Sequence, residues 1–207
     1  MSDRPAPPVP KQPTPANMRA AVQECRACDL YESATQAVMG EGARHASVML
    51  VGEQPGDKED LQGHPFVGPA GRVLDQGLER AGITSEDAYI TNAVKHFRYK
   101  RRGKSRIHQR PDRWQVNACL PWLEAELAMV RPPALMLLGS VAAQALLGPQ
   151  VRIGRDRGRP IESELAELVV VTTHPSAILR APDDDRTAAM DQFVADLRMV
   201  AQWLGRR

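Results

Sequence analysis

The chain has 207 residues, of which 43% are hydrophobic, and a formal net charge of +2. This length suits a domain with its own core, and this composition excludes a chain that is disordered throughout. We find no apolar run long enough to span a bilayer and no secretion signal at the start, so we expect a cytoplasmic protein without a membrane partner.

The predicted elements begin after a proline-rich segment. Residues 1–17, MSDRPAPPVPKQPTPAN, predict a flexible arm ahead of a single domain over 18–207. Short apolar runs then predict four buried strands, at 46–52, 88–94, 133–140 and 168–173. Amphipathic stretches predict helices at 71–82, 115–130, 140–148 and 185–204. This alternation predicts an α/β fold, a three-layer α/β/α domain around a central, mainly parallel four-stranded sheet.

Polar residues follow each predicted strand at its carboxyl end. The segments are GEQPGDKED (52–60), Asn92, a Gly-Ser turn at 139–140 and HPSAILR (174–180). Because ligands of such sheets bind beyond the carboxyl ends of the strands, these side chains are expected to meet at one rim. The sequence therefore predicts a functional site there.

A basic segment follows the second predicted strand. Between Lys95 and Arg113 there are nine basic residues and a single acidic one, Asp112. Such a local excess is typical of contacts with phosphates, although it also occurs on surfaces that only keep a protein soluble. His108 lies within this segment, and taken alone it is most simply an incidental residue of a solvated loop.

The three cysteines suggest a metal site. Cys25 and Cys28 form a C-x2-C pair, and Cys119 lies far downstream. We expect reduced thiols in a protein without an export signal, which favours metal binding over disulfides. Three cysteines cannot complete a four-cysteine site, so another ligand type is needed.

Four segments together resemble a known family. In order and spacing, GEQPG (52–56), GHPFVGPAGRVLD (63–75), TNAVKH (91–96) and HPSAILR resemble the motifs of the uracil-DNA glycosylase superfamily, over roughly residues 20–204. Within it they resemble family 4, the iron–sulfur-containing bacterial and archaeal enzymes. Gln54 stands where family 4 has alanine, and family 4 lacks the basic insert that contains His108. Both departures resemble the X-type branch (UdgX), which excises uracil and becomes covalently attached to DNA through the histidine of that insert.

The resemblance implies that a uracil nucleotide is flipped out of the DNA and read by this chain. Asn92 would hydrogen-bond both N3–H and O4 of uracil, since an amide carries a donor and an acceptor. Phe66, one of three phenylalanines, would stack on the base. From sequence alone, Asn92 could equally cap a turn, and Phe66 could anchor its loop in the core.

The resemblance also implies a set of catalytic residues. His174 and backbone N–H groups around Gln54 would stabilise the anion that develops on uracil O2. Glu53 would orient or polarise His108, which attacks C1′ of the deoxyribose. We expect the basic side chains around His108 to favour its neutral form. Arg106 would hold a phosphate or the shape of the loop. The remaining substrate-binding residues implied are Pro55, Gly56, Asp57 and Ser176.

For the metal site, the resemblance implies that Cys25, Cys28, His96 and Cys119 hold a 4Fe–4S cluster. His96 occupies a position where family 4 usually has cysteine, and iron–sulfur clusters accept histidine ligands. Zinc suits the same four residues on chemical grounds. The cluster would have a structural role and would fix both ends of the basic insert.

The predicted function is therefore excision of uracil from DNA, followed by a stable bond between His108 and C1′. We expect a monomer that acts on uracil-containing DNA, including single strands, and that is associated with the nucleoid of a bacterial cytoplasm when bound. One alternative is a conventional uracil-DNA glycosylase with many turnovers. The other is a non-catalytic module that only binds nucleic acid.

Overall fold

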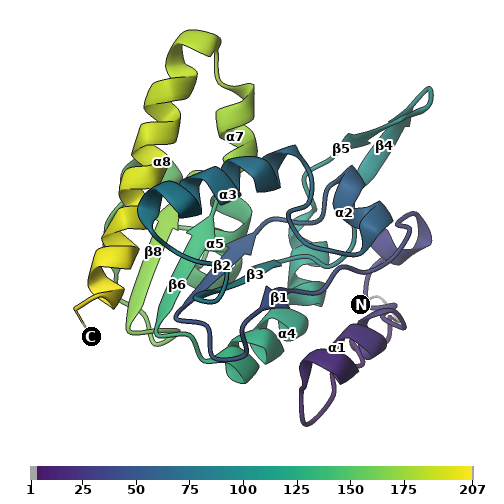
Figure 1. Ribbon diagram of the computed structural model, residues 1–207. Helices are drawn as coiled ribbons and strands as arrows, with labels where there is room; N and C mark the ends of the chain where they lie inside the picture. The colour runs from purple at the N-terminus through teal and green to yellow at the C-terminus, as the bar shows by residue number, and fades with distance from the viewer. Residues whose placement is uncertain (1–3, 207) are drawn as a thin grey trace.

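The computed structural model describes residues 4–206 and has a six-stranded sheet between two layers of helices (Figure 1). Its four central strands are parallel and lie in the order β3 (Ala88–Asn92), β2 (Val48–Gly52), β6 (Ala134–Leu138) and β8 (Leu168–Thr172). Every residue of β2, β6 and β8 is buried, as in parallel sheets that are covered on both faces. The prediction of a three-layer domain with a mainly parallel sheet is confirmed.

The sheet is larger than the four strands expected. Two short antiparallel strands form its edges, β1 (Glu41–Gly42) beside β3 and β7 (Pro160–Ile161) beside β8. Each has two residues, so no apolar run marks it in the sequence.

Helices cover both faces of the sheet, because successive side chains of its apolar strands point to opposite faces and both sets must be buried. One face carries α3 (Pro69–Ala81), α7 (Pro175–Arg180) and α8 (Asp183–Leu204), and the other carries α4 (Arg113–Val130) and α5 (Ser140–Leu147). Val48 and Leu50 of β2 pack with Phe193 of α8, whereas Met49 and Val51 pack with residues of α4 and α5. A further short helix, α6 (Ile153–Asp156), contacts β8. None of the helices in residues 4–206 is long and apolar enough to cross a membrane.

The N-terminal segment joins the domain through a third group of buried residues. Helix α1 (Pro15–Val22) begins inside the segment expected to be a flexible arm, because Thr14 caps it and proline suits the first helical position. Its Met18 and Val22 pack with Trp122 of α4, and a 3-10 turn, η1 (Leu30–Glu32), follows. Residues 1–3 of the expected arm lie outside the described residues.

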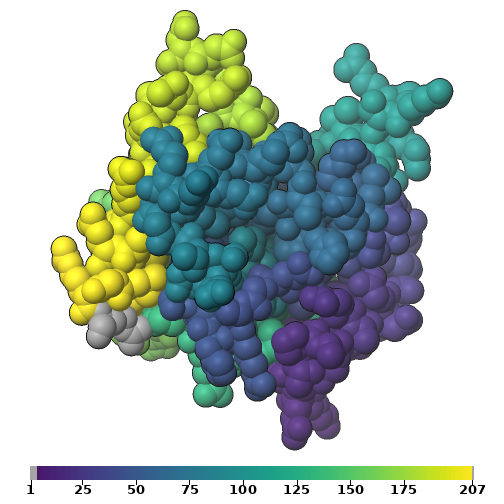
Figure 2. Space-filling view, in the orientation of Figure 1, coloured from purple at the N-terminus to yellow at the C-terminus, as the bar shows by residue number. Residues whose placement is uncertain are grey.

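The basic insert is a hairpin rather than the loop expected from sequence. Strands β4 (Tyr99–Arg102) and β5 (Ser105–His108) pair antiparallel, with Tyr99 opposite His108. Gly103 turns the chain with a φ of 60°, which favours glycine. The hairpin projects from the body near α2 (Asp57–Gln62), as Figures 1 and 2 show.

Candidate active site

A cleft of about 860 Å³ opens at the carboxyl edge of the sheet, lined on one side by the end of the β4–β5 hairpin and on the other by α7. In Figure 2 the hairpin and the region of α7 and α8 stand out on either side of a hollow. The cleft is lined by nine of the site residues proposed from sequence, which are Glu53, Gln54, Gly56, Asp57, Phe66, Asn92, His108, His174 and Ser176. Pro55 and Arg106 are not among its lining residues.

Asn92 and Phe66 meet at the end of β2. The register of β2 and β3 pairs Gly52 with Asn92. A Cβ atom on Gly52 would lie 2.4 Å from Asn92 Oδ1 and 2.6 Å from Phe66 Cζ, so only glycine leaves room for both side chains. Asn92 Oδ1 is buried and has no hydrogen-bond partner among the described residues. Because buried polar atoms are rarely left unpaired, this oxygen indicates a place for a donor from a ligand.

His174 presents a neutral N–H group to the cleft. The backbone N–H of Ser176 donates to its Nδ1 at 3.1 Å, and Ser176 Oγ lies 2.8 Å from the same nitrogen. A nitrogen that accepts a hydrogen bond carries no proton, so the neutral ring carries its proton on Nε2. Burial, together with the nearby His108 and Arg180, lowers the pKa of His174 to about 4. The imidazole is therefore an uncharged donor at neutral pH.

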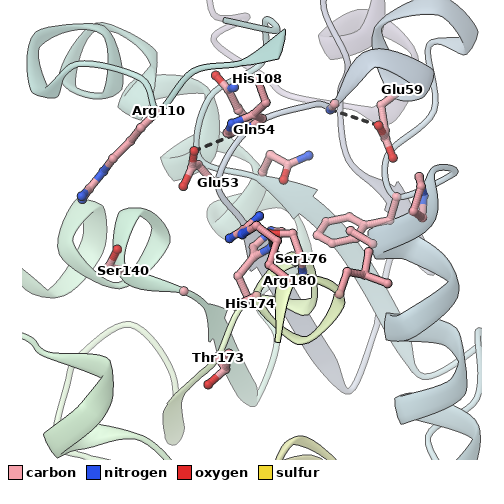
Figure 3. Close-up of a pocket in the computed structure, with 18 of the residues that line it drawn as sticks. Glu53, Gln54, Glu59, His108, Arg110, Ser140, Thr173, His174, Ser176 and Arg180 are labelled. Carbon is pink, nitrogen blue, oxygen red and sulfur yellow. Dashed lines mark hydrogen bonds and ion pairs between the residues drawn. The ribbon is translucent and has the colours of Figure 1, made fainter. Parts of the chain in front are cut away.

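Glu53 and His108 face each other at the mouth of the cleft (Figure 3). His108 Nε2 lies 3.5 Å from Glu53 Oε1, which is within reach of an ion pair but too long for a strong hydrogen bond. Burial raises the pKa of Glu53, although Arg110 and Arg180 act in the opposite direction. Glu53 Oε1 is buried and has no hydrogen-bond partner in the described part of the chain.

The pKa of His108 is lowered, as the sequence predicted, but not by the hairpin's own charges. Burial is the main cause, and the second is Arg180, which comes from α7 on the opposite side of the cleft. The lowered pKa agrees with the expected neutral imidazole of His108. The expected cause, charge repulsion by the basic side chains around His108 in the hairpin, was wrong. The β4–β5 hairpin itself extends away from the body of the domain (Figure 1).

Gln54 fastens the base of the hairpin. Its Nε2 donates to the backbone carbonyls of Arg98 at 3.2 Å and Gln109 at 3.0 Å, and its Oε1 accepts from the N–H of Arg98 at 3.2 Å. Arg98 and Gln109 lie directly before β4 and after β5. The side chain of Gln54 therefore bonds both ends of the hairpin that carries His108, a role that the sequence did not suggest.

Arg106 holds the hairpin against α2. Its guanidinium donates to Asp57 Oδ1 at 2.6 Å and to Asp60 Oδ2 at 2.5 Å, and it lies 5.1 Å from the centre of the Tyr99 ring. The arginine side chain is only 12% exposed. Of the two roles expected for Arg106, these contacts support the one of shaping the hairpin. They also engage the carboxylate of Asp57.

Several residues that line the cleft were given no role from sequence. They include Lys58, Glu59, Arg110, Ser140, Thr173 and Arg180. Arg180 lowers the pKa of Glu53, His108 and His174, so its positive charge acts on all three proposed catalytic residues. Its signal in the sequence was its position as the last residue of HPSAILR. Glu59 has no comparable signal, since its partners are backbone groups.

The three cysteines gather in one buried group between the N-terminal segment and α4. The backbone N–H of Lys95 donates to Cys119 Sγ at 3.2 Å, and the indole N–H of Trp122 donates to Cys25 Sγ at 3.3 Å. Burial raises the pKa of the Cys119 thiol to about 12, so a metal that binds this sulfur must displace its proton.

His96 directly follows Lys95 and is 4% exposed. Burial is the main reason that its pKa falls to about 4, and the neutral imidazole is the form that binds metals. Three buried thiols and a neutral imidazole thus fit an iron–sulfur cluster or zinc by their chemistry. Among residues 4–206, however, no group of three or more histidine, cysteine and acidic side chains is arranged to hold a metal ion.

The mainly parallel sheet covered by helices on both faces, with a cleft at the carboxyl ends of its strands, defines a protein of the α/β class. Residues 39–198 match the Uracil DNA glycosylase superfamily, and the chain belongs to this superfamily. This confirms the superfamily indicated by the motifs.

Three similar proteins carry the name Type-4 uracil-DNA glycosylase. The protein of Pyrobaculum aerophilum is 35% identical over 185 residues, which cover 86% of this chain and 88% of that protein. The protein of Thermotoga maritima is 36% identical over 160 residues (77% and 80%), and that of Archaeoglobus fulgidus is 32% identical over 193 residues (90% and 91%). The similarity to family 4 is confirmed, whereas these names do not distinguish the X-type branch from family 4.

Proposed function

We propose that the protein excises uracil from DNA and then forms a stable bond between His108 and deoxyribose C1′, the single-turnover reaction of the X-type branch. The observation that carries this proposal is the position of His108, 3.5 Å from Glu53 at the mouth of the cleft that contains Asn92. The substrate is uracil-containing DNA, including single strands. The protein acts as a monomer in a bacterial cytoplasm and joins the nucleoid when bound.

Three side chains supply the groups that read uracil. Asn92 Oδ1, unpaired among the described residues, accepts from N3–H, and the amide nitrogen donates to O4. The Phe66 ring stacks on the base, because it packs at Gly52 beside Asn92. His174 lies 6.0 Å from Phe66 between ring centres and donates from Nε2 to O2.

The bond between C1′ and uracil N1 breaks with its electron pair moving to the base. The neutral N–H of His174 stabilises the resulting negative charge on O2, a role suited to a preorganised donor. The lone pair of an unprotonated nitrogen of His108 then forms a bond to C1′. The proton on the other ring nitrogen leaves to Glu53 or to solvent. The neutral azole that remains on C1′ is a poor leaving group, so the strand stays attached.

A conventional glycosylase with many turnovers is the second candidate. It is favoured by Glu53 Oε1, which has no hydrogen-bond partner among residues 4–206 and can hold a water molecule for attack on C1′. Both candidates use the same recognition residues and differ only in the nucleophile. A non-catalytic binding module would release no free uracil.

The cofactor we propose is a 4Fe–4S cluster held by Cys25, Cys28, His96 and Cys119, with zinc as the alternative. The gathering of the three thiols and the neutral state of His96 support this set. The group has a structural role, since base excision transfers no electron. Iron, sulfide and zinc analysis of protein prepared without oxygen distinguishes the two cofactors, and stoichiometric zinc without iron would exclude the cluster.

A crosslinking experiment tests the covalent step. Wild-type protein mixed with a labelled single-stranded uracil oligonucleotide is expected to give a complex that survives heat and detergent, with about one uracil released per protein at most. The matched thymine oligonucleotide should give none. Release of many uracils per protein without a covalent species would establish the conventional reaction instead.

Two variants separate the roles of the facing residues. In His108→Ser the crosslink should disappear, and the space left beside Glu53 admits water, so uracil release should become catalytic. In Glu53→Gln both crosslinking and release should fall, because the carboxylate serves either nucleophile. Crosslinking by His108→Ser at the wild-type level would show that another residue attacks C1′.

A further inference from the structure

Helix α2 contributes three residues to the lining of the cleft, Asp57, Lys58 and Glu59. Its Asp57 and Asp60 bind Arg106 of the hairpin that carries His108. Glu59, on the same helix, lines the cleft and is 7% exposed. The segment GDKED (56–60) therefore contacts both the hairpin, through its two aspartates, and the cleft, through its buried glutamate.

Glu59 joins the two loops that form the cleft. Its Oε2 accepts the backbone N–H of Gly56 at 3.0 Å, and its Oε1 accepts the backbone N–H of Gly68 at 2.7 Å. Gly56 precedes α2, and Gly68 precedes α3. A carboxylate is favourable at both helix starts, where backbone N–H groups have no partner within the helix. One side chain thus connects the loop after β2, which carries Glu53, with the loop that carries Phe66. Figure 3 shows where Glu59 lies relative to Glu53 and Gln54.

The loop around Phe66 needs such support. Phe66 has a φ of 55°, in the left-handed region that is unfavourable for a bulky residue. Its carbonyl is pressed against α3, where a Cβ atom on Gly71 would lie 1.5 Å from Phe66 O. Strained backbone of this kind persists only when surrounding contacts hold it. The bond from Glu59 to Gly68, two residues after Phe66, is one of these contacts.

We propose that Glu59 is a positioning residue for uracil recognition, which acts through the Phe66 loop. Its carboxylate keeps the Phe66 ring beside Asn92 and fixes the distance between this ring and the Glu53 loop. The inference rests on the proposed excision of uracil from DNA. It adds a residue whose side-chain hydrogen bonds, within the described part of the chain, are all with backbone groups and which itself need not touch the base.

A double-mutant cycle tests the coupling. Glu59→Gln retains one acceptor oxygen and places an NH₂ group against a backbone donor, so the bridge between Gly56 and Gly68 is broken. We expect single-turnover uracil release to slow by roughly 10- to 100-fold, since a misplacement of about 1 Å costs up to about 100-fold. In Phe66→Ala the ring is absent, so adding Glu59→Gln should slow release little further.

The control is Glu124→Gln, which makes the same chemical change at an exposed residue of α4 and should leave release and its coupling to Phe66 unchanged. If the losses in Glu59→Gln and Phe66→Ala multiply in the double variant, Glu59 acts independently of Phe66 and the proposal is wrong. Wild-type release by Glu59→Gln would also overturn it.

A second variant covers the case in which Glu59→Gln fails to fold. Gly68 has a φ of −88°, which any residue adopts, and a Cβ atom there would lie 2.9 Å from Glu59 Oε1. The methyl group of Gly68→Ala should therefore push the Glu59 carboxylate away from Gly68 and slow uracil release by the same factor as Glu59→Gln. In a Phe66→Ala background, Gly68→Ala should have little further effect. Unchanged release by Gly68→Ala would contradict the bridge.

A readout without catalysis separates this proposal from the proposed function. The NMR signals of the Phe66 ring should shift in Glu59→Gln or Gly68→Ala and stay fixed in Glu124→Gln. If wild-type protein releases no uracil, the proposed function fails, yet the ring signals still decide whether Glu59 holds Phe66. Unmoved ring signals together with normal wild-type release would overturn the role of Glu59 alone.

Discussion

Replacing Lys95 with methionine should destabilise the protein strongly, because it would leave Glu126 buried without its cationic partner. The two side chains are both 0% exposed, and Lys95 Nζ lies 2.5 Å from Glu126 Oε2. Methionine is similar in length and shape but carries no charge. Removing one partner of a buried ion pair typically costs about 3–5 kcal/mol of unfolding free energy.

The structure places the expected loss near the lower end of that range. Glu126 also accepts hydrogen bonds from Tyr89 Oη at 3.0 Å, Thr91 Oγ1 at 2.9 Å and the N–H of Gly40 at 2.8 Å, and these donors remain in the variant. A loss of about 3 kcal/mol corresponds to a decrease in Tm of about 6–12 °C for a chain of this size.

The same variant should affect uracil release. Lys95 Nζ also donates to the backbone carbonyl of Asn92 at 2.7 Å, so it holds the residue proposed to read the base. Thermal unfolding followed by circular dichroism measures the stability, and single-turnover release measures the function.

Lys11→Met, at an exposed position, is the matched control. Adding Glu126→Gln to Lys95→Met should recover part of the lost stability, since the uncompensated charge is removed. A Tm of Lys95→Met within about 2 °C of the wild type would refute this reasoning.

Three further outcomes follow from the cleft. Asn92→Asp lacks the donor for uracil O4, so single-turnover release should fall by about 100-fold or more while the circular dichroism spectrum is retained; release at the wild-type rate would mean that another residue reads the base. Uracil release should decrease on the acid side with a midpoint above 4.5, because burial raises the pKa of Glu53 above this ordinary value and the carboxylate is the active form; a profile that is flat down to pH 4 would contradict this role. Affinity for uracil-containing DNA should fall with salt, and replacing Lys100 and Arg101 with alanine should reduce the slope of log K against log salt by about 0.7 per lost phosphate contact; an unchanged slope would place the DNA away from the hairpin.

The parallel core of the fold could be predicted because burial leaves a simple trace in the sequence. Each central strand is an apolar run, and every residue of β2, β6 and β8 is indeed buried. The β4–β5 hairpin leaves no such trace. Its strands read YKRR and SRIH and are largely exposed, so charge conceals the alternation that would indicate strands.

The membership of the cleft was easier to predict than the role of each member. Parallel strands end at one edge, so residues that follow them must lie close together. The roles of Gln54 and Arg106 depend on partners that no sequence pattern predicts. Gln54 binds the carbonyls of Arg98 and Gln109. Arg106 binds the carboxylates of Asp57 and Asp60. The role of Glu59 could not be predicted for the same reason, since its partners are backbone N–H groups.

The choice between a covalent product and turnover depends on which nucleophile is closer to C1′. Water is present at high concentration, so an imidazole competes only if it is held in place, and well-oriented neighbouring groups reach effective concentrations of about 10⁵ M or more. The His108 ring itself is half exposed, and its side chain has no hydrogen bond to other residues in the described part of the chain. Apart from its Nε2 atom lying 3.5 Å from Glu53 Oε1, its position is therefore set by the hairpin, through Gln54 at its base and Arg106 against α2. The choice between the covalent product and turnover thus depends on Gln54 and Arg106, which hold the hairpin, as much as on His108. Neither Gln54 nor Arg106 needs to touch the DNA to have this effect.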